Sequence, residues 1–247
     1  MSSTDSEKIM VASKQTIQRL LRDVKQLIKN PLIDNGIYYI HDEANIFMGY
    51  ALIVGPSDTP YFGGYYCFKF EYPNNYPFSP PKVTYCTNNG YTRFNPNLYT
   101  NGKVCVSILN TWSGDEWSAC QTISSVLLIL CSLLNNEPLV NEPGHRKSDA
   151  FFQPYYDMIE YENINTAICG MLNKKYLVSP FDSFMPQMIE HFNKNYQTIM
   201  DFIENKMKEP VKQYNTNNIY SMKGLLDYQI LKNRMIDIKK LIQNNNI

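Results

Sequence analysis

Hydrophobic and polar residues first follow a regular pattern between residues 13 and 29. Apolar side chains recur there every three or four positions, with charged residues between them, as on one face of an amphipathic helix. These side chains are Ile17, Leu20, Leu21, Val24 and Leu27. Ser13 is a suitable N-cap, although Thr16 rather than Glu or Gln stands three residues later. Pro31 ends the pattern, so we predict one helix over 13–29.

Four segments after this helix have the composition of β-strands. They are residues 36–41, 47–54, 65–72 and 82–86. In the third, aromatic residues occupy every second position from Tyr66 to Tyr72, which places them on one face of a strand. Short connections rich in Gly, Pro and Asn separate these segments. The pattern therefore favours a four-stranded antiparallel meander.

The second half of the chain is mainly helical in pattern. Apolar spacing predicts a central helix that starts near residue 121 and is stopped at 135–138. Further helical segments lie near 149–174, 184–208 and 221–244, separated by prolines and an Asn-rich stretch. Residues 87–119 show no period and contain both tryptophans. We predict an α+β fold: an N-terminal helix, the meander, a central helix and C-terminal helices.

The same pattern divides the chain into three parts. Residues 1–9 form a polar leader that we expect to be flexible, without the apolar core of a signal peptide. Residues 10–174 form the predicted main domain, and 175–247 form a helical C-terminal extension. This extension is either a docking surface for a partner or a stabilising cap, and both alternatives stay open.

Charge and composition exclude several classes of protein. The chain has 23 basic and 23 acidic residues, so no general field attracts nucleic acid or an anionic membrane. Its longest apolar stretch, 126–134, is far shorter than the roughly 20 residues of a membrane span. The six cysteines form no C-x-x-C pair, and the three histidines are scattered, so we expect no metal site. We expect reduced thiols and a location in the cytoplasm, the nucleus or both.

The most specific pattern lies between residues 76 and 118. It consists of Tyr-Pro-Phe-Ser-Pro-Pro at 76–81, Asn-Pro-Asn at 95–97, Cys105, and two tryptophans just before the central helix. This ordered set resembles the ubiquitin-conjugating enzyme family. That family has a Tyr-Pro-x-x-Pro-Pro turn, a His-Pro-Asn element, a catalytic cysteine eight residues beyond its Asn, and a Trp-Ser-Pro-Ala loop. Here Cys105 follows Asn97 by eight positions, since 105 − 97 = 8.

The chain also departs from the common pattern of this family. Asn95 replaces the histidine, Ala119 and Cys120 replace Pro and Ala, and the segment 104–118 is longer. Apart from Ala119 and Cys120, these departures resemble the Z-type subgroup, which has Asn-Pro-Asn, an inserted loop with two tryptophans, an Asn-Glu-Pro-Gly stretch and a helical C-terminal extension. Here Asn-Glu-Pro-Gly stands at 141–144. The giant conjugating enzyme with an inhibitor-of-apoptosis repeat is the next resemblance.

The resemblance implies the ubiquitin-conjugating (UBC) fold over 10–174 and thioester chemistry on Cys105. The thiol would accept ubiquitin or a ubiquitin-like modifier from an activating enzyme and pass it to a substrate lysine or a ligase cysteine. Such a sulfur must be an accessible nucleophile and a good leaving group, so we expect it exposed in a shallow groove. No histidine is close to Cys105 in sequence, which suits a carrier better than a protease.

Further site residues are implied by the same resemblance. Asn97 is expected to stabilise negative charge on the carbonyl oxygen, or to hold the loop. Glu142 or Asn141 is expected to orient the attacking lysine, and a shift of one residue decides between them.

The family presents three positions to ligases, which correspond here to Phe78, Ser118 and Ala119. Phe78 can equally pack in the core. Trp112 and Trp117 are expected to be packing residues.

The implied partners are the modifier, an activating enzyme, ligases and protein substrates, and we expect a monomer. No phosphate-binding G-x-x-x-x-G-K-[ST] loop is present, so we expect no cofactor, with ATP used by the upstream activating enzyme. Two other classes stay open. One is a binding module without catalysis. The other is a cysteine hydrolase, which requires His41, His145 or His191 beside Cys105.

Overall fold

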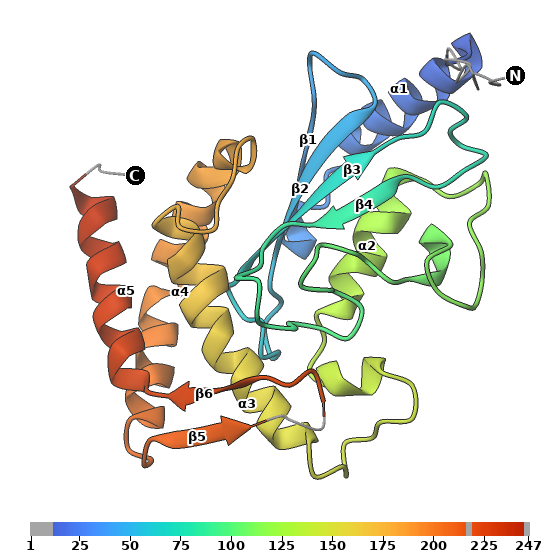
Figure 1. The fold of residues 1–247 in the computed structure, drawn as a ribbon. Helices are drawn as coiled ribbons and strands as arrows, with labels where there is room; N and C mark the ends of the chain where they lie inside the picture. The colour runs from blue at the N-terminus through green and yellow to red at the C-terminus, as the bar shows by residue number, and fades with distance from the viewer. Residues whose placement is uncertain (1–11, 216–218, 245–247) are drawn as a thin grey trace, which may run out of the picture.

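The computed structural model describes residues 12–215 and 219–244, and its fold is α+β as predicted (Figure 1). Its helices and strands are, in chain order, α1 (Lys14–Lys29), β1 (Ile37–His41), β2 (Met48–Val54), β3 (Tyr65–Glu71), β4 (Lys82–Tyr85), α2 (Ile123–Leu133), α3 (Phe152–Glu162), α4 (Met185–Lys206), β5 (Lys212–Asn215), β6 (Lys223–Leu226) and α5 (Tyr228–Gln243). The predicted leader, 1–9, lies outside the described residues. None of the described helices has both the length and the apolar character needed to cross a membrane.

Helix α1 begins where its sequence pattern predicts, and Leu20, Val24 and Leu27 of the predicted apolar face are buried, but Leu21 is 40% exposed. The Ser13 hydroxyl accepts a hydrogen bond from the backbone nitrogen of Thr16 at 3.1 Å, which caps the first turn. Arg19, paired with Asp23 in the next turn, donates to the carbonyl oxygens of Ala119 and Gln121, each at 2.7 Å. Helix α1 therefore holds the chain that leads into α2.

The four strands form the predicted meander, in the order β1-β2-β3-β4, with every neighbouring pair antiparallel. In the register, Phe68 of β3 faces Ala51 of β2 on one side and Tyr85 of β4 on the other. All three residues are buried, which confirms the aromatic face predicted from the alternation in 65–72.

The opposite face of the sheet is also buried, which alternation alone does not predict. Tyr65 and Cys67, on that face of β3, are almost completely buried. Helix α4 packs on this face: the Tyr65 hydroxyl donates to the Met188 carbonyl oxygen at 2.7 Å, and Tyr38 of β1 bonds His191 of α4 at 2.8 Å. The C-terminal extension thus supplies part of the core of the main domain.

The prediction of an entirely helical C-terminal part is wrong in one respect. Strands β5 and β6 pair as a separate antiparallel hairpin, with Tyr214 opposite Gly224, and β6 occupies the start of the segment predicted as helix 221–244. Helix α5 begins only after Asp227, whose carboxylate caps it by accepting from the Gln229 nitrogen at 3.0 Å. Lys212, Gln213 and Asn215 make β5 largely polar and each strand has only four residues, so no strand pattern is visible in the sequence.

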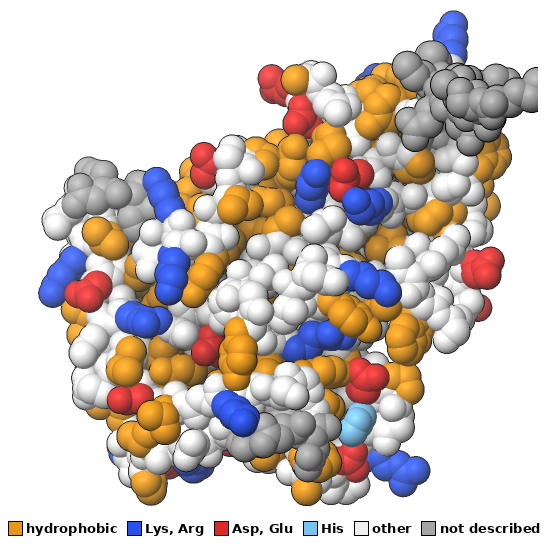
Figure 2. Space-filling view, viewed as in Figure 1, with side chains coloured by type: hydrophobic (Ala, Val, Ile, Leu, Met, Phe, Trp, Pro, Cys, Tyr) orange, Lys and Arg blue, Asp and Glu red, His pale blue; other side chains and the backbone are white. Residues whose placement is uncertain are grey.

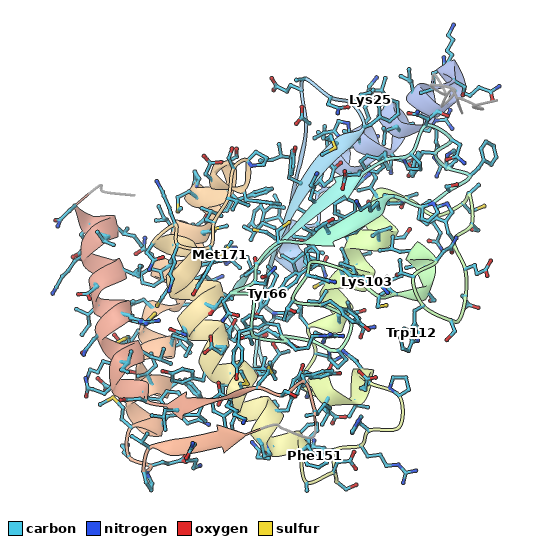
Figure 3. All side chains as sticks on the ribbon, in the orientation of Figure 1. Lys25, Tyr66, Lys103, Trp112, Phe151 and Met171 are labelled. Carbon is cyan, nitrogen blue, oxygen red and sulfur yellow. The ribbon has the colours of Figure 1, made fainter. Side chains whose placement is uncertain are left out.

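The predicted helical segment 149–174 is helical, but its pitch changes along its length. Helix α3 continues into a π-helix, Asn163–Gly170, against which α5 packs alongside α4. Asn163 at this junction accepts a hydrogen bond from the Tyr66 hydroxyl at 2.8 Å and donates to the Phe62 carbonyl oxygen at 2.9 Å. Figure 3 shows Tyr66 in the interior, where these bonds join the sheet to the C-terminal helices.

Candidate active site

The segment before Cys105 folds back on itself and fixes the position of the thiol. Bridges between Asn95 and Leu98, and between Leu98 and Val104, close this segment, and the Cys105 nitrogen donates to the Asn97 carbonyl oxygen at 2.9 Å. Gly102 allows the turn because its φ is +89° and an added Cβ would lie 2.9 Å from a Thr84 methyl carbon. The spacing of eight residues therefore produces direct backbone contact between Asn97 and Cys105.

The structure corrects the expectation of an exposed thiol, because Cys105 is only 3% exposed. Its Sγ donates a hydrogen bond to the Thr111 carbonyl oxygen at 3.0 Å. Thr111 is itself held over the site, since its hydroxyl oxygen accepts from the Val106 nitrogen at 2.9 Å and donates to the Val106 carbonyl at 3.0 Å. The lengthened segment after Cys105 thus folds back over the sulfur.

We call residues 110–117 the covering loop. Asn110 enters it in the left-handed conformation, with φ of +55°, and its side-chain oxygen accepts from the Trp117 nitrogen at 2.8 Å. The Trp117 indole donates to the Pro77 carbonyl oxygen at 2.6 Å. Trp117 is buried as predicted, whereas Trp112 is 43% exposed and lies at the outer edge of the loop (Figure 3), which contradicts its expected packing role. The bonds of Trp117 to Asn110 and to Pro77 thus hold the two ends of the covering loop in place.

The Asn97 carboxamide is engaged with the backbone of Cys105 and not with its sulfur. Its Nδ2 donates to the Cys105 carbonyl oxygen at 2.6 Å. Its Oδ1 is buried and has no hydrogen-bond partner among the described residues. The bond to Cys105 serves the expected role of holding the loop, and the second N–H of the same amide nitrogen is the donor that the expected oxyanion role requires.

Asn95 locks Asn97 to the end of α2. It is fully buried, and its Nδ2 donates to the Leu133 carbonyl oxygen at 2.8 Å and to the Tyr61 hydroxyl at 3.1 Å. Its Oδ1 accepts from the Asn97 nitrogen at 2.9 Å. A carboxamide supplies both donors and an acceptor here, which explains how Asn serves structurally at a position where the wider family has His.

Asn141 and Glu142 differ in what they contact. Asn141 donates to the Leu133 carbonyl oxygen at 3.1 Å and accepts from Asn135 at 3.1 Å, so its side chain is occupied by the end of α2. The half-buried Glu142 carboxylate accepts a hydrogen bond from the hydroxyl of Tyr220, in the C-terminal extension. Of the two candidates, Glu142 alone has an ionisable group.

The sequence of this chain is similar to known sequences over most of its length. The sequence pattern described as ubiquitin-conjugating enzyme matches residues 19–153, more than half of the chain. The chain belongs to the ubiquitin-conjugating enzyme family. It is therefore an enzyme that transfers ubiquitin through a thioester, and it works in general with ubiquitin, an activating enzyme and ligases.

Several relatives of this ubiquitin-conjugating enzyme extend the similarity beyond the matched domain. Ubiquitin-conjugating enzyme E2 Z of Danio rerio is 38% identical over 245 residues, which cover 97% of this chain and 71% of the relative. The same-named protein of Homo sapiens is 37% identical over 227 residues, 90% of this chain and 62% of the relative. These matches confirm the resemblance to the Z-type subgroup.

A third relative is far larger. The human dual E2 ubiquitin-conjugating enzyme/E3 ubiquitin-protein ligase BIRC6 is 37% identical over 199 residues, 76% of this chain and 4% of that protein. The similarity therefore concerns one small part of the larger enzyme.

In this ubiquitin-conjugating enzyme the three predicted ligase-contact positions lie on two segments that a hydrogen bond joins. Phe78 is 76% exposed, so its alternative role in the core is wrong. Ser118 is exposed and Ala119 is half-buried. The bond between the Trp117 indole and Pro77 joins the two segments that carry these positions.

The other cysteines and the histidines show no sign of a second nucleophilic centre. Cys67 and Cys169 are buried, and burial raises the pKa of the Cys169 thiol to about 12. The histidines are half-buried and hydrogen-bonded: His41 bonds Tyr39 and Ile46, His145 bonds Asp149, and His191 bonds Tyr38. Because each histidine is engaged elsewhere, the geometry does not favour a cysteine hydrolase.

Arg93 is a site residue that the sequence analysis missed. Its guanidinium donates to the carbonyl oxygens of Asn95, at 3.2 Å, and Pro96, and lies 3.3 Å from the centroid of the Tyr99 ring. Arg93 thereby supports the backbone that carries Asn97. A cation two residues before Asn-Pro-Asn, with an aromatic residue two positions after it, is the sequence signal for this arrangement.

On the face drawn in Figure 2, acidic and basic side chains are interspersed, in keeping with the zero net charge. Within the described part of the chain, no three His, Cys, Asp or Glu side chains gather closely enough to hold a metal ion.

Proposed function

We propose that Cys105 carries ubiquitin or a ubiquitin-like modifier as a thioester. The observation that supports this most is the reciprocal pair of hydrogen bonds between Asn97 and Cys105, which fixes the thiol and the carboxamide in one turn. In the first step the Cys105 sulfur forms a bond to the modifier's terminal carbonyl carbon, and the activating enzyme's thiol leaves and takes up a proton. In the second step an amine forms the C–N bond, the C–S bond breaks, and the Cys105 thiol is regenerated.

Both steps require the acyl carbon to reach the Cys105 sulfur, which the covering loop occludes in this structure. The loop therefore opens before transfer, breaking the bond between Sγ and the Thr111 carbonyl. Its central residues, from Ser113 to Glu116, are exposed and present little apolar area that would oppose this movement.

The remaining site residues act around the acyl carbon. Asn97 holds the Cys105 backbone, and its second amide N–H is available to the oxygen on which negative charge develops. Glu142 orients the incoming lysine and favours loss of its proton, with Asn141 holding the loop on which Glu142 lies. Phe78, Ser118 and Ala119 contact ligases.

The chain needs no cofactor, because ATP is used upstream to activate the modifier. It acts as a monomer on protein substrates in the cytoplasm or the nucleus, and residues 10–174 constitute its conjugating domain.

A charging assay tests the proposal. The chain is incubated with activating enzyme, ATP and modifier, and the products are separated on a non-reducing gel. We expect Cys105→Ala to form no reducible adduct, and Cys120→Ala, which removes an exposed thiol, to charge normally. A reducible adduct that persists on Cys105→Ala would reject the assignment.

A further inference from the structure

The C-terminal extension reaches the active site through Tyr220. In Figure 1 the hairpin of β5 and β6 lies beside α3 and extends toward the loop that follows α2. Tyr220 and Ser221, just before β6, both adopt the left-handed conformation, with φ of +56° and +51°. That conformation is costly for a bulky side chain and persists where surrounding contacts impose it. Tyr91 anchors the same hairpin by donating to the Lys223 carbonyl oxygen at 2.8 Å.

Tyr220 makes three kinds of contact in this position. Its hydroxyl donates to the Glu142 carboxylate. Its ring packs against Tyr155 of α3, with 5.8 Å between ring centroids. The Arg93 guanidinium lies over its face, 4.9 Å from the centroid. Burial, followed by the bond to Glu142, raises the pKa of Tyr220, so its hydroxyl keeps the proton that it donates.

Through Arg93 the same ring also reaches the Asn-Pro-Asn segment. The Arg93 guanidinium lies over the rings of both Tyr220 and Tyr99. It also donates to the carbonyl oxygens of Asn95 and Pro96. Tyr220 of the extension thus contacts two parts of the site. One is the Glu142 carboxylate on the loop after α2, and the other is Arg93, which supports the segment that carries Asn97.

We propose that Tyr220 is a positioning residue for the transfer step, so that the C-terminal extension completes the active site. The inference rests on the proposed function of Cys105 and Glu142. The Tyr220 hydroxyl holds the Glu142 carboxylate in one orientation, and the second carboxylate oxygen accepts an N–H of the acceptor lysine. Charging of Cys105 involves no lysine, so it does not depend on this bond.

The substitution Tyr220→Phe isolates the hydroxyl, because the ring and its packing against Arg93 and Tyr155 are retained. Full-length chain is charged, activation is then stopped, and discharge to free lysine is followed over a range of lysine concentrations and pH. We expect charging within twofold of wild type and discharge slowed about tenfold, as expected for loss of a hydrogen bond to a charged group. Tyr91→Phe is the matched control, since it removes a hydroxyl from the contact with the same hairpin, and it should discharge at the wild-type rate.

A double variant separates positioning from a merely structural effect. If Tyr220 acts through Glu142, Tyr220→Phe combined with Glu142→Gln should discharge no more slowly than Glu142→Gln alone, with the same pH profile. Wild-type discharge by Tyr220→Phe, or rate losses that multiply in the double variant, would overturn the inference. A wild-type chain that never charges would instead refute the proposed function of Cys105.

Discussion

At the scale of single residues, hydrogen bonds fix two carboxamides in the segment that leads to Cys105. Asn97 and Asn95 form a chain of bonds from the Cys105 carbonyl to the end of α2. A buried amide that loses a partner leaves an unsatisfied group behind, so each link matters more than a bond at the surface. The two asparagines nevertheless have different roles, because of the two only Asn97 contacts Cys105.

For Asn97→Ala we expect charging of Cys105 to be largely retained and transfer to lysine to fall on the order of 10²-fold, the usual loss for one oxyanion donor. Single-turnover charging and discharge, measured separately, test this. Asn101→Ala, an exposed amide in the same segment, is the control. Equal losses in both steps would show that Asn97 only holds the loop.

For Asn95→Ala we expect a loss of about 2 kcal/mol in the free energy of unfolding, because the Leu133 carbonyl and the Asn97 nitrogen lose a buried partner. Urea denaturation measures this loss. A midpoint equal to that of Asn101→Ala would contradict the structural role of Asn95.

At the scale of elements, the covering loop decides when the sulfur is accessible. The loop is held at its base by Trp117, through its bond to Pro77, and directly over the thiol by the Thr111 carbonyl. The sequence does not predict this contact, because a residue of any type at position 111 supplies a backbone carbonyl. The sequence therefore revealed that the loop is long, but not that it covers Cys105.

Trp117→Phe removes the indole bond to Pro77 but keeps an aromatic ring. We expect iodoacetamide to alkylate Cys105 about fivefold faster in this variant. The covering loop then opens without breaking the bond to Pro77, so the free energy of opening is lower by about the value of one hydrogen bond. Peptide mass spectrometry follows each thiol, and exposed Cys120 serves as the internal control with an unchanged rate. Unchanged alkylation of Cys105 would show that the loop is not the barrier.

Apart from β5, β6 and the start of α5, the helices and strands were predictable to within a few residues, because periodicity directly reflects burial. The alternation from Tyr66 to Tyr72 identified β3, and the apolar spacing around Leu20 identified α1. Strands β5 and β6 were missed because each is four residues long and they form a separate two-stranded sheet. The burial of Tyr65 was missed because it packs against α4, which lies far along the chain.

At the scale of the whole molecule, the extension shares one hydrophobic core with the conjugating domain. Buried residues of α4 and α5, such as Met188 and Leu231, belong to the same cluster as Tyr65 of the sheet. Cys105 and Asn97 were predicted as site residues from sequence because their spacing is local, and the structure brings their backbones into contact. Tyr220 and Arg93 were not, because only the folded chain brings such distant positions together.

Leu231→Ala tests whether this shared core couples the two parts. Both tryptophans, Trp112 and Trp117, lie in the conjugating domain, so their fluorescence reports its unfolding. We expect the substitution to lower the stability seen by fluorescence by roughly 2–5 kcal/mol. Exposed Ile230→Ala should change it by no more than about 0.5 kcal/mol. A tryptophan transition that does not move would show that the extension is an independent domain.

The most direct test of the central claim is to trap the acyl group and locate it. Cys105→Ser replaces the labile thioester by an oxyester that resists thiol reductants, so the modifier's remnant survives digestion and peptide mass spectrometry. We expect the remnant on residue 105, removable by hydroxide. A remnant found on Cys120, or only on lysine side chains, would contradict the account.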